Sequence, residues 1–341
     1  MEIWTTEYHT AGEPFRIVAE PPVAIVGETV AAKRVFAMRD PEVDGLRQLL
    51  CFEPRGHADM YGCLVVPPND AGADLGVLFW HKDGFSTACG HGTIAVGAWA
   101  VNSGRVAAPA DGVVDVRIDV PSGRVTARVH TEGGKARAVD FINVPSYLIA
   151  QRVPVSTSLG ELHVDVSFGG AIYAQLNVAD VGLSVTPADL TQLIEIGREI
   201  KWALNDAPVA QHPTDERLSG IYGTIIYEEL EPVAAQPGAA PSLTQRNVTI
   251  FADGEVDRSP CGSGTAARVA TLYAQGQLAP GELLVHDSII GSRFLATIID
   301  TVSEVGQPAI IPMITGAAFQ TGESHFTVDP ADDLTPGFVL R

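Results

Sequence analysis

The sequence predicts an α/β protein of the α+β type, made of two related β-rich halves that are each built around one buried helix. The main observation is a duplicated pattern, Cys-Gly-x-Gly-Thr-x-Ala, which begins at Cys89 and again at Cys261 in a chain of 341 residues. The 34 glycines and 23 prolines indicate many turns between short strands. Hydrophobic residues make up 46% of the chain, which is enough for two cores, and a chain of this length favours two domains.

Strand and helix patterns fill both halves. In the first half they predict strands at 3–9, 15–19, 63–66, 75–80, 113–120, 125–130 and 136–144, and helices at 41–50 and 93–101. In the second half they predict strands at 162–168, 171–178, 221–227, 248–251, 283–285, 292–299, 309–314 and 325–328, and helices at 187–204 and 262–274. The helix at 93–101 is apolar on nearly all sides, so it is expected to be buried. Gly197 lies on the apolar face of the 187–204 helix and marks a close packing contact.

The switch between the halves is expected near residues 144–147. This gives a first half at 1–146 and a second half at 147–327, with a C-terminal segment at 328–341 that is a candidate to return to the first half. Residues 232–241 have low complexity, with three prolines and four alanines, and predict a surface loop.

Composition excludes several classes of function. The net charge of −19 argues against nucleic acid or an anionic membrane as a partner, because no basic stripe exists to neutralise phosphates. No run of about 18 apolar residues is present that could span a bilayer. The opening Met-Glu-Ile-Trp is unlike a signal peptide, and four cysteines without a Cys-x-x-Cys pair favour reduced thiols. A cytoplasmic protein is therefore expected.

Each copy of the duplicated pattern can support thiol chemistry. A cysteine directly before Gly-x-Gly-Thr and a helix is expected at the helix N-terminus, where unpaired amides and the helix dipole lower the thiol pKa. The glycines let the backbone approach a ligand closely, and the amides can bind a carboxylate. If the pattern occurred once, a buried cysteine followed by a glycine turn would be enough to explain it. Packing gives no reason to repeat the cysteine together with the glycines and the threonine.

Two thiols beside carboxylate cradles, one from each half, suggest a single site between the halves. One thiolate can remove the proton next to a carboxylate while the other thiol returns a proton to the opposite face. The amides would stabilise the negative charge that develops. A zinc site at Cys89, His91 and Cys261 lacks compact ligand spacing, and a cysteine hydrolase leaves the second thiol unexplained. A non-catalytic binding protein for small imino acids explains the cradles but gives the thiols no role.

Two polar residues near the thiols have open roles. Asp257 lies four residues before Cys261, where it can hold a substrate ammonium or simply cap a turn. His91 lies two residues after Cys89, where it can contact the substrate or be an ordinary residue of the first helical turn.

Four segments resemble the signatures of the proline racemase family. They are His-Thr-Ala-Gly-Glu-Pro at 9–14, Glu-Pro-Arg-Gly-His-Ala-Asp-Met at 53–60, Cys-Gly-His-Gly-Thr-Ile at 89–94 and Asp-Arg-Ser-Pro-Cys-Gly-Ser-Gly at 257–264. The resemblance implies a diaminopimelate-epimerase-like fold with the active site in the cleft between two pseudo-symmetric, barrel-like domains. It also implies no pyridoxal phosphate, no other cofactor and no metal, and a homodimer as the common assembly. Members include proline racemase, 4-hydroxyproline 2-epimerase and trans-3-hydroxy-L-proline dehydratase.

The resemblance assigns roles to residues by motif position. Cys89 and Cys261 correspond to the acid/base pair, and His91 and Asp257 to residues that contact the substrate amine. The amides that would hold the substrate carboxylate are those of Gly90, His91, Gly262 and Ser263.

Two aromatic residues complete the implied site. Phe251 matches a family aromatic that closes on the substrate ring, and Tyr61 falls where another pocket aromatic is expected; ordinary core packing is the alternative for both. Tyr61 or His57 could hydrogen-bond a ring hydroxyl and so favour hydroxylated substrates.

A departure from the family pattern bears on the choice of subgroup. Residues 31–34, 61–62 and 75–79 look most like the trans-3-hydroxy-L-proline dehydratase branch, yet well-known members of that branch carry Thr at the position of Cys261. A second thiol is what inversion needs. The sequence therefore favours racemisation or epimerisation of proline or 4-hydroxyproline, with dehydration of trans-3-hydroxy-L-proline as the alternative.

Overall fold

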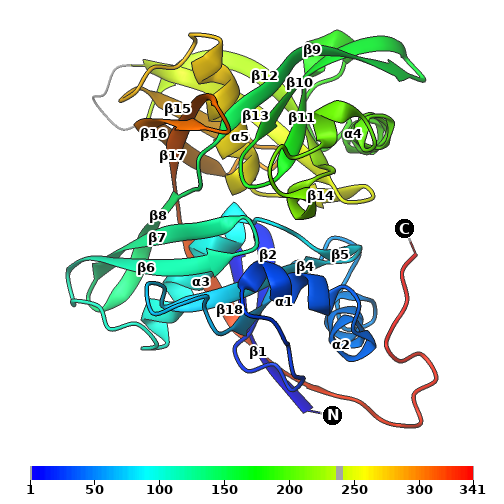
Figure 1. The fold of residues 1–341 in the computed structure, drawn as a ribbon, viewed down its shortest axis with the longest axis vertical. Coiled ribbons are helices and arrows are strands. Elements are labelled where there is room, and N and C mark those ends of the chain that lie inside the picture. The colour runs from blue at the N-terminus through cyan, green and yellow to red at the C-terminus, as the bar shows by residue number, and fades with distance from the viewer. Residues whose placement is uncertain (1, 236–240, 341) are drawn as a thin grey trace. The chain divides into compact units, whose positions relative to one another are not determined.

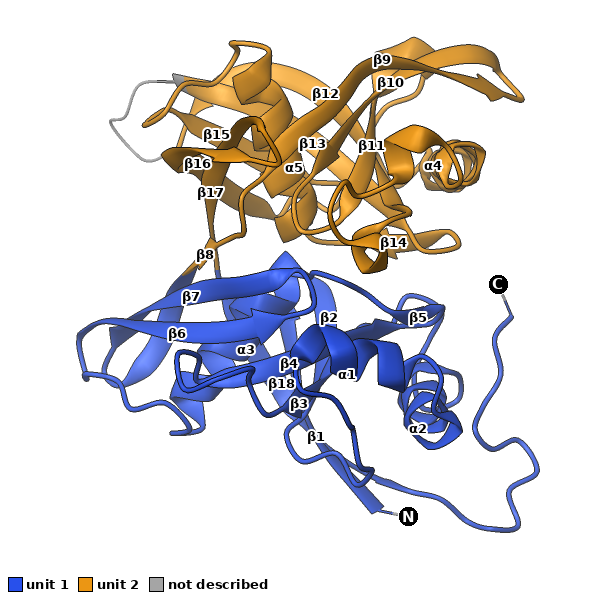
Figure 2. Cartoon of the chain, in the orientation of Figure 1, with its two compact units in different colours: residues 1–139, 317–341 blue, residues 140–316 orange. Residues whose placement is uncertain are grey.

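The computed structural model describes residues 2–235 and 241–340, and its elements are labelled in Figure 1. The chain forms two compact units, which Figure 2 colours separately. Unit 1 comprises Met1–Val139 and Ala317–Arg341, and unit 2 comprises Asp140–Gly316. The sequence-based division placed these boundaries at 146/147 and 327/328.

Unit 1 contains three helices, two of them short. The helices are α1 (Val30–Ala37), α2 (Pro41–Cys51) and α3 (Gly90–Asn102). The strands are β1 (Glu2–Thr10), β2 (Glu13–Val18), β3 (Gly62–Val66), β4 (Leu75–His81), β5 (Gly84–Phe85), β6 (Gly112–Val120), β7 (Gly123–Glu132) and β18 (Ala318–Thr327), and β8 (Lys135–Ile142) runs on into unit 2. Strand β1 pairs antiparallel with both β2 and β18, β2 continues in parallel to β3, and β4 links β3 to β6 and β7.

Helix α3 is the centre of unit 1. Every residue from Gly90 to Val101 is buried. The helix contacts β1, β2, β6, β7 and β18, so strands approach it from several sides. This explains why the segment is apolar all round rather than amphipathic. The prediction of a buried helix at 93–101 is confirmed, and the helix begins three residues earlier, directly after Cys89.

Unit 2 repeats this arrangement around α5 (Gly262–Ala274), whose bounds match the predicted helix. The strands are β9 (Tyr147–Thr157), β10 (Gly160–Phe168), β11 (Ile172–Asn177), β12 (Ile221–Ala234), β13 (Pro241–Phe251), β14 (Glu255–Asp257), β15 (Leu283–Ser288), β16 (Arg293–Glu304) and β17 (Gln307–Gly316), with α4 (Leu190–Leu204) as a second helix. Three short 3₁₀ helices lie at Val178–Val181, Pro208–Ala210 and Glu216–Leu218. Helix α5 contacts β9, β10, β11, β16 and β17, so each unit is a β-rich layer wrapped around one buried helix.

The sequence-based prediction misses one helix and three strands, namely α1, β5, β9 and β14, and it misplaces the ends of other elements. Helix α1 has only eight residues and is capped by Thr29, whose hydroxyl accepts the Ala32 amide at 3.1 Å. Strand β9 was missed because most of its residues are exposed or half-buried, which leaves no clear alternation. Helix α4 begins at Leu190 instead of residue 187. The loop prediction is wrong at 232–234, which continue β12, and its residues 236–240 lie outside the described residues.

Across the residues that the structure describes, we find no helix with both the length and the apolar character needed to cross a membrane.

Gly197 of α4 packs directly on the sheet of unit 2, as its position in the sequence predicted. A methyl group added at Gly197 would lie 2.7 Å from Cβ of Ile250 on β13. The Gly197 carbonyl also accepts the hydroxyl of Thr224 on β12 at 2.8 Å. Because the neighbouring atoms include a branched Cβ held by the sheet, there is no flexible group that can move aside.

We expect Gly197→Ala to lower the free energy of unfolding by about 1–3 kcal/mol, because it overpacks this contact. The intrinsic helix preference of alanine over glycine, about 1 kcal/mol, opposes that loss. Gly45→Ala in α2 is the matched control, since an added methyl there meets nothing within 4 Å. It should raise stability by about 0.5–1 kcal/mol. Urea unfolding measures both, and equal stabilisation by the two substitutions would contradict the packing argument.

Candidate active site

The first thiol caps a buried helix. Cys89 is the N-cap of α3 and has an extended backbone, with φ −155° and ψ 107°. Its Sγ accepts the Gly92 amide at 3.3 Å, and its carbonyl accepts both the amide and the hydroxyl of Thr93, at 3.0 and 2.8 Å. The predicted position at a helix N-terminus is confirmed, and it brings the sulfur next to the amides of the first turn.

An ordered histidine lies beside this sulfur. Both ring nitrogens of His91 lie 3.5–3.6 Å from the Sγ of Cys89, so either can face the thiol. The imidazole of His91 makes T-shaped contacts with two aromatic rings. Its centroid lies 5.0 Å from that of Tyr61 and 5.7 Å from that of Phe15. Unit 1 therefore brings together Cys89, His91 and Tyr61 from the predicted set.

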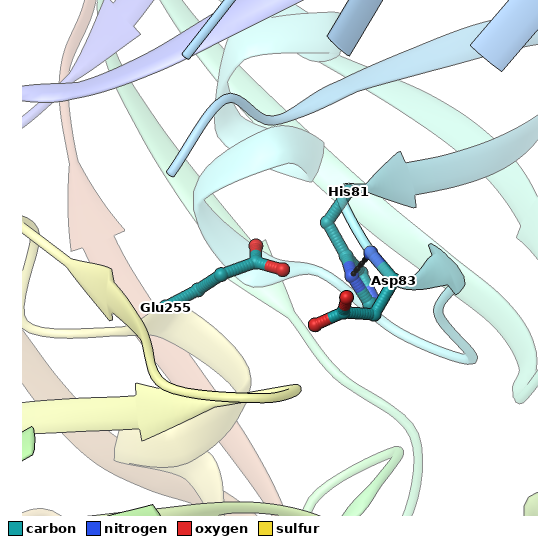
Figure 3. Close-up of side chains that lie close together, drawn as sticks. All are labelled: His81, Asp83 and Glu255. Carbon is teal, nitrogen blue, oxygen red and sulfur yellow. Dashed lines mark hydrogen bonds between the residues drawn. The ribbon is translucent and has the colours of Figure 1, made fainter. Parts of the chain in front are cut away.

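Tyr61 is held on its other side as well. Its hydroxyl shares a 2.6 Å hydrogen bond with Ser86, and its ring lies 5.8 Å from the ring of His81. The Asp83 amide donates to Nδ1 of His81 at 3.2 Å, as drawn in Figure 3, which also draws Glu255 of β14 in unit 2. Burial lowers the pKa of His81 to about 3, so this ring is neutral at neutral pH. His57, predicted as an alternative partner for a substrate hydroxyl, is exposed.

The second thiol also begins a buried helix, but its backbone differs. Cys261 precedes α5 with φ 62° and ψ 103°, a left-handed conformation that is rare for a residue with a side chain. Its carbonyl accepts the Thr265 amide at 2.6 Å, as the carbonyl of Cys89 accepts the Thr93 amide. The two copies of the pattern therefore share a sequence and a helix but not the conformation of the cysteine.

The second glycine of each copy makes room for the sulfur. A methyl group added at Gly92 would lie 2.8 Å from the Sγ of Cys89, and one added at Gly264 would lie 2.8 Å from the Sγ of Cys261. Any larger residue would push the sulfur away from the helix. At Gly92 the ring of Phe15 lies closer still, with Cε2 2.5 Å from the added methyl. The sulfur contact is common to both copies and accounts for the second glycine, so the expectation that packing gives no reason for the repeat is wrong for that residue.

A tyrosine that the sequence analysis missed faces the second thiol. The Tyr173 hydroxyl lies 3.9 Å from the Sγ of Cys261 and shares a 2.7 Å hydrogen bond with Ser263. The Tyr173 ring meets the edge of Tyr222, which in turn stacks on Phe251. A tyrosine in a buried strand was the available signal, because a buried phenol needs a hydrogen-bond partner.

Asp257 organises the turn before the second thiol. Its Oδ1 accepts the amide and the hydroxyl of Ser259, at 2.8 and 2.7 Å. The Ser259 oxygen then accepts the Cys261 amide at 3.0 Å. Oδ1 of Asp257 therefore caps the turn, which was one of the two predicted roles of this residue. The other role, contact with a substrate amine, stays a prediction.

Comparisons with known proteins agree along the whole chain. The profile of the family described as proline racemase matches residues 5–339. The chain belongs to the proline racemase family. It is 42% identical to a trans-3-hydroxy-L-proline dehydratase of Bacillus cereus, over 99% of this chain and 98% of that protein. It is 41% identical to a 3-hydroxyproline 2-epimerase of Burkholderia multivorans, with the same coverage, and 36% identical to a proline racemase of Clostridioides difficile, again over 99% and 98%.

Solved structures confirm the predicted fold class for this proline racemase family member. A hydroxyproline epimerase from Agrobacterium vitis, with bound trans-4-hydroxy-L-proline, is similar at a TM-score of 0.90 and 30% identity, covering 99% of this chain and 96% of that one. A phenazine biosynthesis protein of the PhzF family from Bacillus anthracis has a TM-score of 0.56 at 12% identity, covering 96% of this chain and 100% of that one, and shares the fold alone.

The electrostatics of Cys261 correct one expectation. A helix N-terminus was expected to lower the pKa of each thiol. Burial instead raises the pKa of Cys261, and the Asp257 carboxylate raises it further, while the Gly264 amide and the hydroxyls of Thr249 and Tyr173 lower it. Burial outweighs the polar groups because a thiolate loses most of its solvation by water when it is buried. Cys261 is therefore a protonated thiol at neutral pH.

The other two cysteines are core residues of unit 1. Cys51 and Cys63 are fully buried, and neither forms a disulfide, so reduced thiols stay a prediction. Burial raises the pKa of Cys63, which makes it a poor nucleophile.

We expect Tyr173→Phe to slow alkylation of Cys261 by iodoacetamide about 3- to 10-fold at neutral pH, because the lost hydroxyl stabilises the thiolate. Mass spectrometry of the modified peptides reports the rate, with Cys89 in the same molecule as the reference. Tyr147→Phe is the matched control, since that buried hydroxyl of unit 2 lies 3.3 Å from His212 instead. An unchanged rate at Cys261, or an equal change at both cysteines, would count against this role of Tyr173.

Proposed function

We propose that this protein removes the α-proton of proline or a hydroxyproline with Cys89 and Cys261 as an acid/base pair, and so racemises proline or epimerises 4-hydroxyproline at the α-carbon. The observation that carries the proposal is that each central helix begins directly after a thiol packed on a glycine. Family membership and the relatives named as racemases and epimerases support it.

The two sulfurs suit complementary roles. The Cys89 sulfur accepts the Gly92 amide and lies 3.5–3.6 Å from the ring nitrogens of His91, one of which can donate an N–H to a thiolate, so Cys89 is proposed as the base. Cys261 is buried and holds its proton at neutral pH, so it is proposed as the acid. In the reaction, the Cys89 sulfur takes the α-proton, the electron pair of the broken C–H bond moves onto the substrate carboxylate, and Cys261 gives its proton to the opposite face. The reverse reaction exchanges the two roles.

The remaining predicted residues are proposed to hold the substrate. The amides of Gly90, His91, Gly262 and Ser263 precede the first intrahelical bonds, which Thr93 and Thr265 donate. Amides in such a first turn stabilise a carboxylate, and more so as it gains charge in the transition state. His91 and Asp257 are proposed to contact the substrate amine, with Tyr61 and Phe251 against the ring.

Dehydration of trans-3-hydroxy-L-proline is the second candidate, and the names of several relatives at 41–42% identity favour it. The same α-proton removal would be followed by loss of the 3-hydroxyl as water, if an acid protonates it. The product would be a cyclic imine after the ring double bond shifts. The presence of a thiol at position 261 favours inversion over this outcome.

Separate incubations with L-proline, trans-4-hydroxy-L-proline and trans-3-hydroxy-L-proline in D₂O distinguish the candidates. We expect deuterium at the α-carbon of the substrate and inversion seen by polarimetry. Trapped imine from the 3-hydroxy substrate, with no inversion of the other two, would replace epimerisation by dehydration. A protein that binds these imino acids without any exchange would be a binding protein and not an enzyme.

Cys89→Ser and Cys261→Ser should each reduce inversion by at least about 100-fold, because a serine hydroxyl is a far weaker acid and base at neutral pH than a thiol. Cys63→Ala is the control and should retain turnover, since that thiol lies in the core with a raised pKa. Full activity in either serine variant would remove the two-thiol mechanism. Cys261→Thr tests the branch directly, because a remaining dehydratase activity without inversion would show that one thiol suffices for water loss.

A further inference from the structure

The peptide unit before Cys261 is held at both of its polar atoms. Its carbonyl, that of Pro260, accepts the Thr265 hydroxyl at 3.0 Å and the Asn247 amide at 3.1 Å. Its N–H, that of Cys261, donates to the oxygen of Ser259 at 3.0 Å. Turning this peptide plane would break all three bonds, and it is the orientation of this plane that sets the φ angle of Cys261.

A buried histidine contacts both side chains that donate to the Pro260 carbonyl. Nδ1 of His286 lies 2.8 Å from the Thr265 hydroxyl, and its Nε2 lies 2.9 Å from the Asn247 side-chain nitrogen. Thr265 gives its single proton to Pro260, so it accepts from Nδ1–H, while Asn247 donates to Nε2. Burial lowers the pKa of His286 to about 3, so the neutral ring that this pattern needs is the form present at neutral pH.

The first copy of the pattern lacks this arrangement at its cysteine. The hydroxyl of Thr93 bonds to the carbonyl of Cys89 itself and not to the peptide before it. There the cysteine has a negative φ and its sulfur caps the helix. The same threonine position therefore makes a different bond in each copy, and the cysteine conformation differs with it.

We propose that Thr265, Asn247 and His286, which we name the Pro260 clamp, are positioning residues that hold Cys261 at its positive φ and direct its sulfur to Tyr173. The Pro260 clamp joins three elements, since Thr265 lies on α5, Asn247 on β13 and His286 on β15. All three side chains are fully buried. The inference rests on the proposed function in one respect, which is that the sulfur so directed is the one that exchanges a proton with the substrate.

A double-mutant cycle between the Pro260 clamp and Tyr173 tests the proposal on the full-length protein. Thr265→Val keeps the shape of the side chain and removes its hydroxyl, and Thr265→Ser keeps the hydroxyl as the conservative control. Each is combined with Tyr173→Phe. The readouts are iodoacetamide alkylation of Cys261 relative to Cys89, and kcat and KM for α-proton exchange in D₂O.

In Thr265→Val we expect kcat for exchange to fall about 10-fold with KM changed by less than about 2-fold, because the misplaced sulfur transfers protons poorly while substrate contacts remain. Thr265→Ser should stay close to the wild type. In the Thr265→Val background, Tyr173→Phe should no longer slow alkylation of Cys261, since the sulfur has already left the tyrosine. Asn247→Leu, which releases the same carbonyl from β13, repeats the cycle should Thr265→Val not fold.

Two results would overturn the proposal. The first is that Tyr173→Phe changes alkylation of Cys261 equally in the wild type and in Thr265→Val, or changes it in neither. In both cases the Pro260 clamp would not direct the sulfur to Tyr173. The other is a fall in melting temperature with equal changes at Cys89 and Cys261, which describes a purely structural role. A wild-type protein without α-proton exchange would defeat the proposed function alone, because the alkylation cycle still reports on the Pro260 clamp.

Discussion

The packing of a cysteine sulfur on a glycine at the start of a buried helix is the contact on which each unit depends. The helix is buried because strands contact it from several directions, and helix geometry gives the amides of its first turn no carbonyl partner in a preceding turn. The sulfur and the glycine occupy the space at that end. Since a methyl group at the glycine would lie 2.8 Å from the sulfur in either unit, the glycine cannot be replaced by a larger residue without moving the sulfur.

The two units differ in the backbone conformation of the cysteine that precedes the central helix. Cys89 is extended and accepts an amide from its own helix, whereas Cys261 has a positive φ and faces a tyrosine. A non-glycine residue at positive φ costs about 1–3 kcal/mol and persists only where its surroundings fix it. In unit 2 that constraint comes from the two hydrogen bonds that the Pro260 carbonyl accepts and from the one that the Cys261 amide donates to the Ser259 oxygen.

Much of this could be read from the sequence because it depends on local pattern. Helix α5 and the burial of α3 follow from apolar periodicity, and the thiol positions follow from the repeated motif. Tyr173 and the Pro260 clamp could not be found in this way, since their partners lie on separate strands and the contacts arise only when the sheet forms. The prediction of a lowered pKa for Cys261 was wrong for the same reason, because the burial that raises this pKa is a property of the folded unit and not of the motif.

The proposed acid/base pair works best when the two thiols have different pKa values. If both thiols had equally low pKa values, both would be ionised and no acid would be present to complete inversion. If both were raised, no base would be present. Burial beside Asp257 keeps a proton on Cys261, and a ring nitrogen of His91 beside Cys89 can support a thiolate there. Tyr173 and Ser263 can donate or accept in either direction, because each hydroxyl rotates, so the pair can follow Cys261 as it loses and regains its proton. In the proposed mechanism this asymmetry keeps the proton on Cys261 before the reaction and still allows the reverse reaction.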